Sequence, residues 1–342
     1  MKIHIYKESQ YWLLFDEKKG IQYRIGFKEN ASYNCQGPEL LDIAITNYCE
    51  KNCTFCYRKS SITGKHMPII MYEKLLKQAM ECGVMQIALG GGNPNQHPQF
   101  VDILRLTRKY GIIPTYTTNG QGMTDEIYRV TKEVCGAMAV SYYQPLEYLK
   151  QVVRKCKENN IKLNVHFVLG KESIEQAIIL LTNPPAWVKD VNAIIFLNYK
   201  PVRGDIEACL NRSELLDDFW TAVLKFEACK IGFDSCMISF IDSISEKAII
   251  ESIDYCEASR FSAFINEEGM MFPCSFMNDL NYIEGYDLSE DTIKNVWRNG
   301  ATFAGFRECL FSKEDKKCLT CSWFNNCHGG CKLFPINKCE VT

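Results

Sequence analysis

The sequence has no apolar run long enough to cross a membrane and no apolar segment at its start. Its longest apolar runs, such as residues 177–181, are far shorter than the roughly 20 residues of a transmembrane helix. Residues 1–7 alternate apolar and polar side chains and lack the continuous apolar core of a signal peptide. We therefore expect a cytoplasmic protein that does not enter a membrane.

An excess of charge of either sign is also missing. The chain has 39 basic and 41 acidic residues, which argues against broad electrostatic binding of nucleic acid or anionic membrane. Internal repeats and low-complexity segments are absent as well, and 46% hydrophobic against 23% charged residues excludes wholesale disorder. A length of 342 residues fits one barrel-sized domain with an appendage.

Cysteine, in contrast, is abundant, with 18 residues. Disulfide-rich secreted scaffolds are usually short, whereas this chain is long and shows no export signal. The counts therefore indicate thiolates that hold metal. Two groups stand out, one near the N-terminus and one in the last quarter, and they predict two metal-binding regions. Singly placed cysteines are expected to be small buried hydrophobes: Cys35, Cys82, Cys135, Cys156, Cys209, Cys229, Cys236 and Cys309.

From residue 41 onward, short β-rich runs alternate with amphipathic helical patterns. Such alternation implies parallel strands joined by right-handed crossovers. The fold class is therefore α/β, a partial (β/α)6 barrel of the TIM type whose chemistry lies at the carboxyl ends of its strands. The expected strands are residues 41–46, 86–89, 114–118, 137–141, 161–169 and 193–197. The expected helices are residues 71–82, 99–110, 124–135, 146–159 and 173–181.

Four regions are expected along the chain. Residues 1–40 form a short N-terminal β extension with a hairpin turn at 18–20, and residues 41–211 form the partial barrel. Residues 212–255 are a helical connector, and residues 256–342 are a cysteine-rich domain. Within that domain, residues 261–265 and 270–272 predict a β-hairpin, and residues 291–297 predict a short helix.

Cys49, Cys53 and Cys56 have the spacing C-x3-C-x2-C, in the loop directly after the first barrel strand. Three soft thiolates suit a [4Fe–4S] cluster and leave one of its irons without a protein ligand. A zinc site is the alternative, with His66 as the fourth ligand.

At these residues the sequence resembles the radical S-adenosylmethionine (radical SAM) superfamily, whose motif has an aromatic residue where Phe55 stands. The resemblance implies that the three cysteines bind three irons of the cluster and that S-adenosylmethionine (SAM) chelates the fourth. One electron then cleaves SAM to a 5′-deoxyadenosyl radical, which abstracts a hydrogen atom. That chemistry belongs to the cofactor, and the protein positions it.

Further motifs follow the other strands. The run Gly90-Gly91-Gly92-Asn93-Pro94 resembles the G-G-E-P motif of the family, with Asn93 in place of glutamate. Glycine suits a backbone that approaches a ligand closely. The resemblance implies SAM contacts from the strand ends and the cysteine loop, namely Phe55, Gly90, Gly91, Gly92, Asn93, Thr118, Asn119, Ser141, Leu197 and Asn198.

The second cysteine group resembles the seven-cysteine SPASM domain that many radical SAM enzymes carry, with a zinc-ribbon or LIM-like site as the alternative. The resemblance assigns Cys256, Cys274 and Cys331 to auxiliary [4Fe–4S] cluster I. It assigns Cys318, Cys321, Cys327 and Cys339 to auxiliary cluster II, so that the chain holds three clusters in all. Fully ligated members have another cysteine just upstream of the Cys256 position, and residues 249–255 contain none. Cluster I is therefore expected to keep an open iron or to recruit Cys236 or Cys309.

Enzymes of this class largely modify peptides, so the leading hypothesis is a maturase that crosslinks, epimerises or excises part of a ribosomal peptide. Its expected partners are the peptide and an electron donor such as flavodoxin or ferredoxin. Residues 1–40 are too short for the leader-binding domain of some maturases, so a separate protein supplies it or the leader docks elsewhere. Three alternatives stay open. They are a formylglycine-generating sulfatase-maturing enzyme, with Asp234 or Asp242 as base, a small-molecule radical SAM dehydrogenase, and a non-catalytic iron–sulfur electron carrier.

Overall fold

The computed structural model describes residues 2–16, 21–26, 33–51, 53, 55–244, 253–278, 280, 283–312 and 316–336. The turn expected at 18–20, the side chain of Asp242 and the cluster ligand Cys339 lie outside the described residues. The chain folds as two compact units, each assembled from three segments. Met1–Ala139, Glu158–Lys162 and Ala258–Arg307 form the first unit. Val140–Lys157, Leu163–Glu257 and Glu308–Thr342 form the second unit.

The N-terminal extension is a three-stranded antiparallel sheet, one strand more than the expected hairpin. It consists of β1 (Lys2–Tyr6), β2 (Tyr11–Asp16) and β3 (Ile21–Ile25), in that order. Residues alternate between its faces, as the two-residue period of a strand requires. One face buries a small core of Tyr6, Tyr11 and Leu13. The opposite face exposes large apolar side chains, namely Ile3, Ile5, Trp12, Tyr23 and Ile25.

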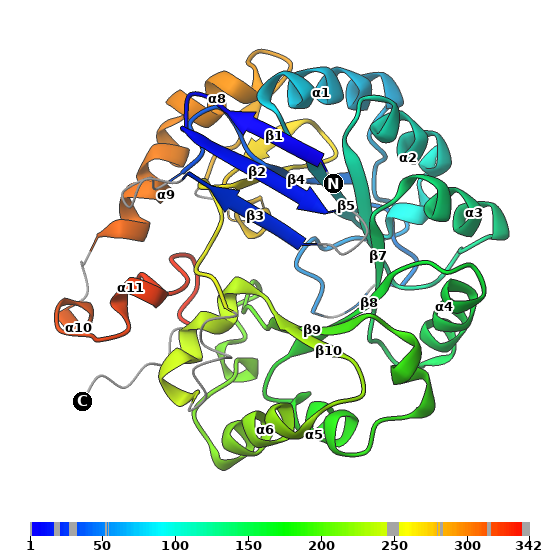
Figure 1. The fold of residues 1–342 in the computed structure, drawn as a ribbon, viewed down its shortest axis with the longest axis vertical. Coiled ribbons are helices and arrows are strands. Elements are labelled where there is room, and N and C mark those ends of the chain that lie inside the picture. Colours follow the sequence, from blue (N-terminus) through cyan, green and yellow to red (C-terminus); the bar gives the residue numbers. More distant parts are fainter. Residues whose placement is uncertain are drawn as a thin grey trace. The chain divides into compact units, whose positions relative to one another are not determined.

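The first unit also holds three parallel strands of the barrel, alternating with helices as expected (Figure 1). The strands are β4 (Leu40–Thr46), β5 (Gln86–Gly91) and β6 (Ile113–Thr118), with β5 between the other two. The helices are α1 (Ile69–Cys82), α2 (Phe100–Lys109) and α3 (Asp125–Val134), with the short η1 (Pro94–Gln96) after β5. Buried and partly exposed residues alternate from Leu40 to Ile43 of β4 and from Gln86 to Leu89 of β5, whereas residues 44–46 of β4 are all buried. One face of the strands is therefore closed by packing and the other is more open.

The hairpin from the C-terminal region belongs to the same unit and extends this sheet. Strand β11 (Ser262–Ile265) pairs with β12 (Met270–Phe272), as expected, and β13 (Tyr286–Asp287) follows. On its other side, β11 runs parallel to β4, with Ser262 opposite Leu40. Helix α8 (Ile293–Asn299) confirms the expected short helix, and its buried Trp297 donates from Nε1 to the carbonyl oxygen of Asn34 at 2.6 Å. The cysteine-rich region and the first barrel strand thus share one sheet.

The second unit continues the β/α alternation after β7 (Ala137–Ser141), which crosses the boundary between the units. Its elements are α4 (Glu147–Glu158), β8 (Leu163–Leu169), α5 (Ile174–Thr182), η2 (Ala186–Asp190), β9 (Ala193–Asn198), η3 (Ile206–Ala208), α6 (Glu214–Lys225), β10 (Lys230–Phe233) and η4 (Ser235–Ser243). Helix α9 (Ala301–Phe311) leads into it, followed by α10 (Lys316–Leu319) and α11 (Phe324–Cys327). Strands β8, β9 and β10 are parallel, with β9 in the middle.

Strand β10 lies where the sequence predicted only a helical connector. It is four residues long and contains a glycine, so its local β signal is weak. Packing compensates for that weakness, because Phe233 lies 6.1 Å from the ring of Phe196 and 5.4 Å from that of Trp220. In the part of the chain that the structure describes, no helix is long and apolar enough to cross a membrane.

Candidate functional site

The cysteine loop that follows β4 is held by backbone hydrogen bonds. Cys49 N donates to Ser61 O at 3.0 Å, and Cys56 N donates to Cys53 O at 3.1 Å, so the chain turns tightly between the last two cysteines. All three thiol side chains are partly exposed, and Phe55 is 39% exposed. Structural cysteines are usually buried. The exposure of these three therefore leaves them accessible to a cluster.

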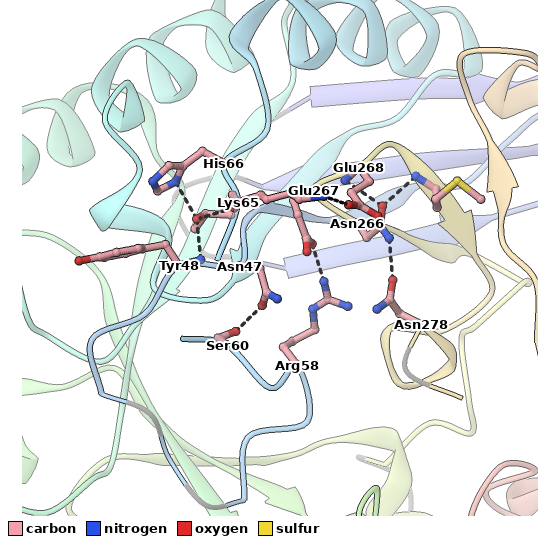
Figure 2. A network of polar contacts seen from close by, with 12 residues as sticks. Asn47, Tyr48, Arg58, Ser60, Lys65, His66, Asn266, Glu267, Glu268 and Asn278 are labelled. Carbon is pink, nitrogen blue, oxygen red and sulfur yellow. Dashed lines mark hydrogen bonds and ion pairs between the residues drawn. The ribbon is translucent and has the colours of Figure 1, made fainter. Parts of the chain in front are cut away.

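Two ion pairs join this loop to the turn between β11 and β12 (Figure 2). The buried guanidinium of Arg58, two residues after Cys56, pairs with Glu267. The exposed ammonium of Lys65 lies 2.7 Å from Glu268 Oε1. Both glutamates belong to a turn organised by Asn266, whose Oδ1 accepts hydrogen bonds from two backbone N–H groups of the turn. Sequence spacing gave no sign of this connection, because more than 200 residues separate the partners in each pair.

His66, the candidate fourth zinc ligand, contacts Thr46 and His97. Its Nδ1 lies 2.8 Å from Thr46 Oγ1, and its ring lies 5.1 Å from that of His97. Burial lowers the pKa of both histidines, which favours the neutral imidazole. Among the described residues, no three His, Cys, Asp or Glu side chains converge as a single metal ion requires. A cluster differs in this respect, because each thiolate binds a separate iron.

The glycines after β5 let two stretches of backbone meet. A Cβ at Gly91, where φ is +109°, would lie 2.0 Å from Thr46 O, and one at Gly92 would lie 2.1 Å from Tyr48 O. In return, Gly92 N donates to Thr46 O at 2.7 Å. Gly90 differs, since no atom lies within 4 Å of the position its Cβ would take. Two glycines thus hold the segment that leads to Cys49, and the third faces open space.

Asn93 connects the glycine motif to the loop after β6. Its Oδ1 accepts from Thr118 Oγ1 at 3.0 Å and from Asn119 N at 3.2 Å, and its Nδ2 donates to Gln121 O at 3.0 Å. Asn119 Nδ2 in turn lies 3.6 Å from Cys49 Sγ. The structure therefore brings together predicted site residues from the cysteine loop, β5 and β6.

Asn95, which the sequence motifs did not indicate, strengthens the same connection. Its Oδ1 accepts from Thr118 Oγ1, and its Nδ2 donates to Gln121 O at 2.6 Å. Asn95 lies on the short η1 after the motif, two residues beyond Asn93, and no sequence pattern indicated it. The hydroxyl of Thr118 therefore makes its hydrogen bonds within the protein.

The remaining predicted SAM contacts lie in the second unit. Ser141 and Leu197 are partly buried at the ends of β7 and β9. Asn198 is fully buried, and its Nδ2 donates to Cys236 O at 3.0 Å and to Ser239 Oγ at 3.3 Å. No hydrogen-bond partner lies on its Oδ1 within the described residues.

A buried ion pair lies beside Asn198. Lys200 Nζ is 2.7 Å from Asp234 Oδ2 and donates to Asn198 O at 2.9 Å, and Asp234 Oδ1 accepts from Asn198 N at 3.2 Å. Burial opposes the charge of Lys200, but Asp234 outweighs it and the pKa of the ammonium stays above its ordinary value. Burial also lowers the pKa of His166 to about 4, against the opposing effect of Asp234. Both oxygens of Asp234 are therefore engaged.

A left-handed turn lies between Cys327 and Cys331. Cys318, Cys321 and Cys327 are partly exposed on α10, α11 and the segment between them. The turn from His328 to Gly330 has three successive positive φ angles, of 49°, 80° and 67°. It passes close to Cys318, since a Cβ at Gly329 would lie 3.8 Å from Cys318 Sγ. Cys274 belongs to the first unit, after β12.

Comparison with known proteins matches two family models to these regions. Residues 43–143 match the radical SAM superfamily, and residues 256–327 match SPASM, an iron–sulfur cluster-binding domain. The first range includes the three-cysteine loop and the motifs after β5 and β6. The second begins at Cys256 and ends at Cys327.

Whole-chain similarities agree with these matches. Mycofactocin maturase MftC of Mycobacterium tuberculosis is 21% identical over 323 residues, which covers 86% of this chain and 78% of that protein. The structure of Streptococcus suis SuiB bound to precursor peptide SuiA has a TM-score of 0.69 at 20% identity, covering 86% of this chain and 72% of that one. The structure of anSMEcpe with bound AdoMet has a TM-score of 0.67 at 16% identity, covering 85% and 89%. These likenesses confirm the expected fold, a partial barrel with a C-terminal cysteine-rich domain.

Proposed function

We propose that this chain, which carries a radical SAM domain and a C-terminal SPASM domain, is an enzyme that cleaves SAM and abstracts hydrogen from a peptide. The observation that carries the proposal is the meeting of three strand ends at Cys49. Asn119 contacts its sulfur, the glycine motif holds the segment before it, and Gly90 faces open space. This arrangement lies at the carboxyl ends of parallel strands, where barrels of this type perform their chemistry.

The residues present fit a [4Fe–4S] cluster with one iron free for SAM. Cys49, Cys53 and Cys56 are three soft ligands that lie partly exposed in one loop. When bound, the cluster and SAM supply the 5′-deoxyadenosyl radical. The protein's part is to hold that loop, through Arg58 on one side and through the bonds of Asn93 on the other. We further propose SAM contacts from Phe55, Gly90, Gly91, Gly92, Asn93, Thr118, Asn119, Ser141, Leu197 and Asn198.

The SPASM match supports auxiliary clusters, and we propose two, for three clusters in total. Cys318, Cys321 and Cys327 form one set, with Cys339 as its fourth ligand, and Cys256, Cys274 and Cys331 belong to the other. The first set is supported by the turn directly after Cys327, because Gly329 in that turn lies close to Cys318. Soft thiolates are the ligands that such clusters take.

We propose a ribosomal peptide as the substrate and the cytoplasm as the location. Support for the substrate comes from the relatives, since one is a mycofactocin maturase and another binds a precursor peptide. Reductive cleavage of SAM needs one electron from outside. The proposed electron donor is therefore a flavodoxin or ferredoxin. The leader of the peptide binds either to a separate protein or elsewhere on this chain.

A direct test is to mix the anaerobic, reconstituted enzyme with dithionite and SAM and to measure 5′-deoxyadenosine. We expect the wild-type chain to form it and the Cys53→Ala variant to lose at least about 100-fold of that activity, because removing a ligand removes the SAM-binding iron. Retention of the other clusters by Cys53→Ala is the control for a general loss of folding. A wild-type chain that is fully loaded with iron but forms no 5′-deoxyadenosine would be an electron carrier instead.

The formylglycine-generating alternative requires a free base near the substrate. Asp234 does not supply one, since both of its oxygens already accept hydrogen bonds from Lys200 and Asn198. Asp242 lies outside the described side chains. Mass spectrometry of a peptide after reaction separates the alternatives, because each predicts a different product from the same substrate.

A further inference from the structure

Cys236 is one of the singly placed cysteines, and the fold fixes its backbone at the carboxyl end of β10. Asp234 N donates to Phe196 O at 3.0 Å, which extends the pairing of β10 with β9. The carbonyl oxygen of Cys236 accepts from Asn198 Nδ2 at 3.0 Å and from Ser239 Oγ at 2.9 Å. These two bonds hold the backbone from which the thiol projects.

The thiol of Cys236 makes a hydrogen bond with the thiol of Cys331. The chain reaches Cys331 through the left-handed turn, where Gly329 and Gly330 take φ of +80° and +67°. Glycine adopts such angles at little cost, so the pair allows the chain to reverse just before the cysteine. Cys331 is an expected ligand of auxiliary cluster I. A cysteine outside the SPASM spacing therefore stands directly beside one inside it.

A second contact brings Cys256 to the same part of the unit. The ring of Tyr255 lies 4.0 Å from that of His328, at the start of the left-handed turn. Cys256 follows Tyr255 directly, and it is another expected ligand of auxiliary cluster I. Two separate contacts thus place parts of the same expected ligand set at one turn.

The charge around this pair also suits thiolates. Lys200 is buried with its ammonium paired to Asp234, and it interacts electrostatically with both Cys236 and Cys331. A buried cation lowers the cost of holding negative sulfur ligands in the same region.

Cys309, the other candidate, lacks such contacts. It lies on α9, where Ser312 Oγ donates to its carbonyl oxygen at 3.1 Å. Among the described residues, its thiol makes no hydrogen bond with another cysteine.

We propose that Cys236 supplies the fourth thiolate of auxiliary cluster I, beside Cys331 and Cys256 of the same unit. The inference rests on the proposed function, because it takes the SPASM clusters as present, and the place of Cys274 comes from the resemblance alone. On binding, Cys236 releases its thiol proton to solvent and its thiolate bonds to iron, with no transfer of electrons. A cluster closed in this way has no iron left for a substrate thiolate, so it serves electron transfer.

The test uses the full-length chain, reconstituted anaerobically, with Cys49, Cys53 and Cys56 replaced by alanine to remove the signals of the SAM cluster. Isotopically labelled cyanide, which binds an open iron, is added, and its hyperfine coupling is measured by electron–nuclear double resonance. In this background we expect no coupling. Adding Cys236→Ala should produce one, because it opens an iron. Adding Cys309→Ala or Cys229→Ala, two matched controls from the same unit, should not.

A second variant covers the case in which Cys236→Ala loses the cluster or does not fold. Cys236→Ser keeps a ligating oxygen, so the cluster should remain but show altered g values in the reduced state. Two results would overturn the proposal. One is cyanide coupling before Cys236 is changed, and the other is a spectrum of Cys236→Ser identical to that of the parent.

These outcomes are separable from a failure of the proposed function. If the wild-type chain forms no 5′-deoxyadenosine but Cys236→Ala opens an iron, the ligand assignment stands and the radical chemistry does not. If SAM is cleaved but replacing Cys236 leaves the spectra of the auxiliary clusters unchanged, the radical chemistry stands and the ligand assignment does not. A disulfide between Cys236 and Cys331 in the anaerobic, cluster-loaded protein, detected by thiol labelling without reductant, would also overturn the proposal.

Discussion

At the scale of single residues, the three glycines after β5 illustrate how one motif combines two requirements. Gly91 and Gly92 are needed by the protein itself, because backbone oxygens occupy the space of a side chain. Gly90 has no such neighbour, which leaves room for a ligand. The sequence predicted close backbone approach at this motif, but the approach at two of the positions is to the chain itself.

This difference makes a prediction for two alanine substitutions. Gly91→Ala should lower the free energy of unfolding by at least about 2 kcal/mol, because a φ of +109° and a contact with Thr46 O both oppose a Cβ. Gly90→Ala should leave stability nearly unchanged and weaken SAM binding instead. Thermal melts followed by circular dichroism give the first comparison, and calorimetric titration with SAM gives the second. Equal destabilisation by both substitutions would contradict the different roles.

The side chain of Asn93 shows what a motif comparison leaves out. The family motif has glutamate at this position, so the resemblance did not indicate what the side chain of Asn93 does. The structure shows an amide that accepts on Oδ1 and donates on Nδ2 at the same time. A carboxylate cannot donate to Gln121 O, so the amide is specific to this local network.

At the scale of elements, the contact between the cysteine loop and the β11–β12 turn depends on one buried and one exposed ion pair. The Arg58 side chain is 1% exposed and that of Glu267 is 10% exposed, whereas Lys65 and Glu268 are 76% and 54% exposed. Breaking a buried pair leaves an unpaired charge away from water, and breaking an exposed pair does not.

We therefore expect Glu267→Ala to cost about 3–5 kcal/mol of stability, because it strands the buried guanidinium of Arg58. Lys65→Ala, the matched control on the same loop, should shift the denaturation midpoint little. Denaturant unfolding of the two variants under anaerobic conditions makes the comparison. Should both variants unfold at the midpoint of the wild type, the buried pair would contribute nothing to holding the loop.

Most of the regular elements could be predicted from the sequence, because their signals are local. The periodicity of residues 71–82, for example, predicts α1, and the hairpin at 261–272 is confirmed by β11 and β12. Three features could not be predicted. Strand β10 depends on packing by Phe233, the parallel pairing of β11 with β4 depends on residues over 200 positions apart, and Arg58 has no local partner. Each is a long-range contact without a local pattern.

The candidate site follows the same division. Spacing alone indicated Cys49, Cys53 and Cys56 as cluster ligands. The structure brings Cys49 into contact with Asn119, as the positions of these two residues at the ends of strands suggested. Asn95 and the partner of Cys236 were not foreseeable in this way. Both depend on where a turn of backbone places a side chain, which the amino-acid types do not reveal.

At the scale of the whole molecule, the proposal of three separate clusters predicts that iron is lost in discrete parts. Replacing Cys49, Cys53 and Cys56 with alanine should remove about one third of the iron and inorganic sulfide and abolish SAM cleavage, while the auxiliary clusters remain. Replacing Cys318 and Cys321 should remove a similar fraction but leave SAM cleavage without peptide present. Iron analysis together with the 5′-deoxyadenosine assay checks both expectations. Loss of all iron in either variant would show that the clusters do not assemble independently.

The pairing of β11 with β4 has a consequence for how the protein is made. As the chain leaves the ribosome, β4 emerges early, but the strand that covers one of its edges is synthesised some 220 positions later. Until then that edge presents unpaired backbone groups, which attract other strands. Completion of this edge must therefore wait until β11 has been translated. The loop beside β4 also gains its ion pairs with the β11–β12 turn only at that stage.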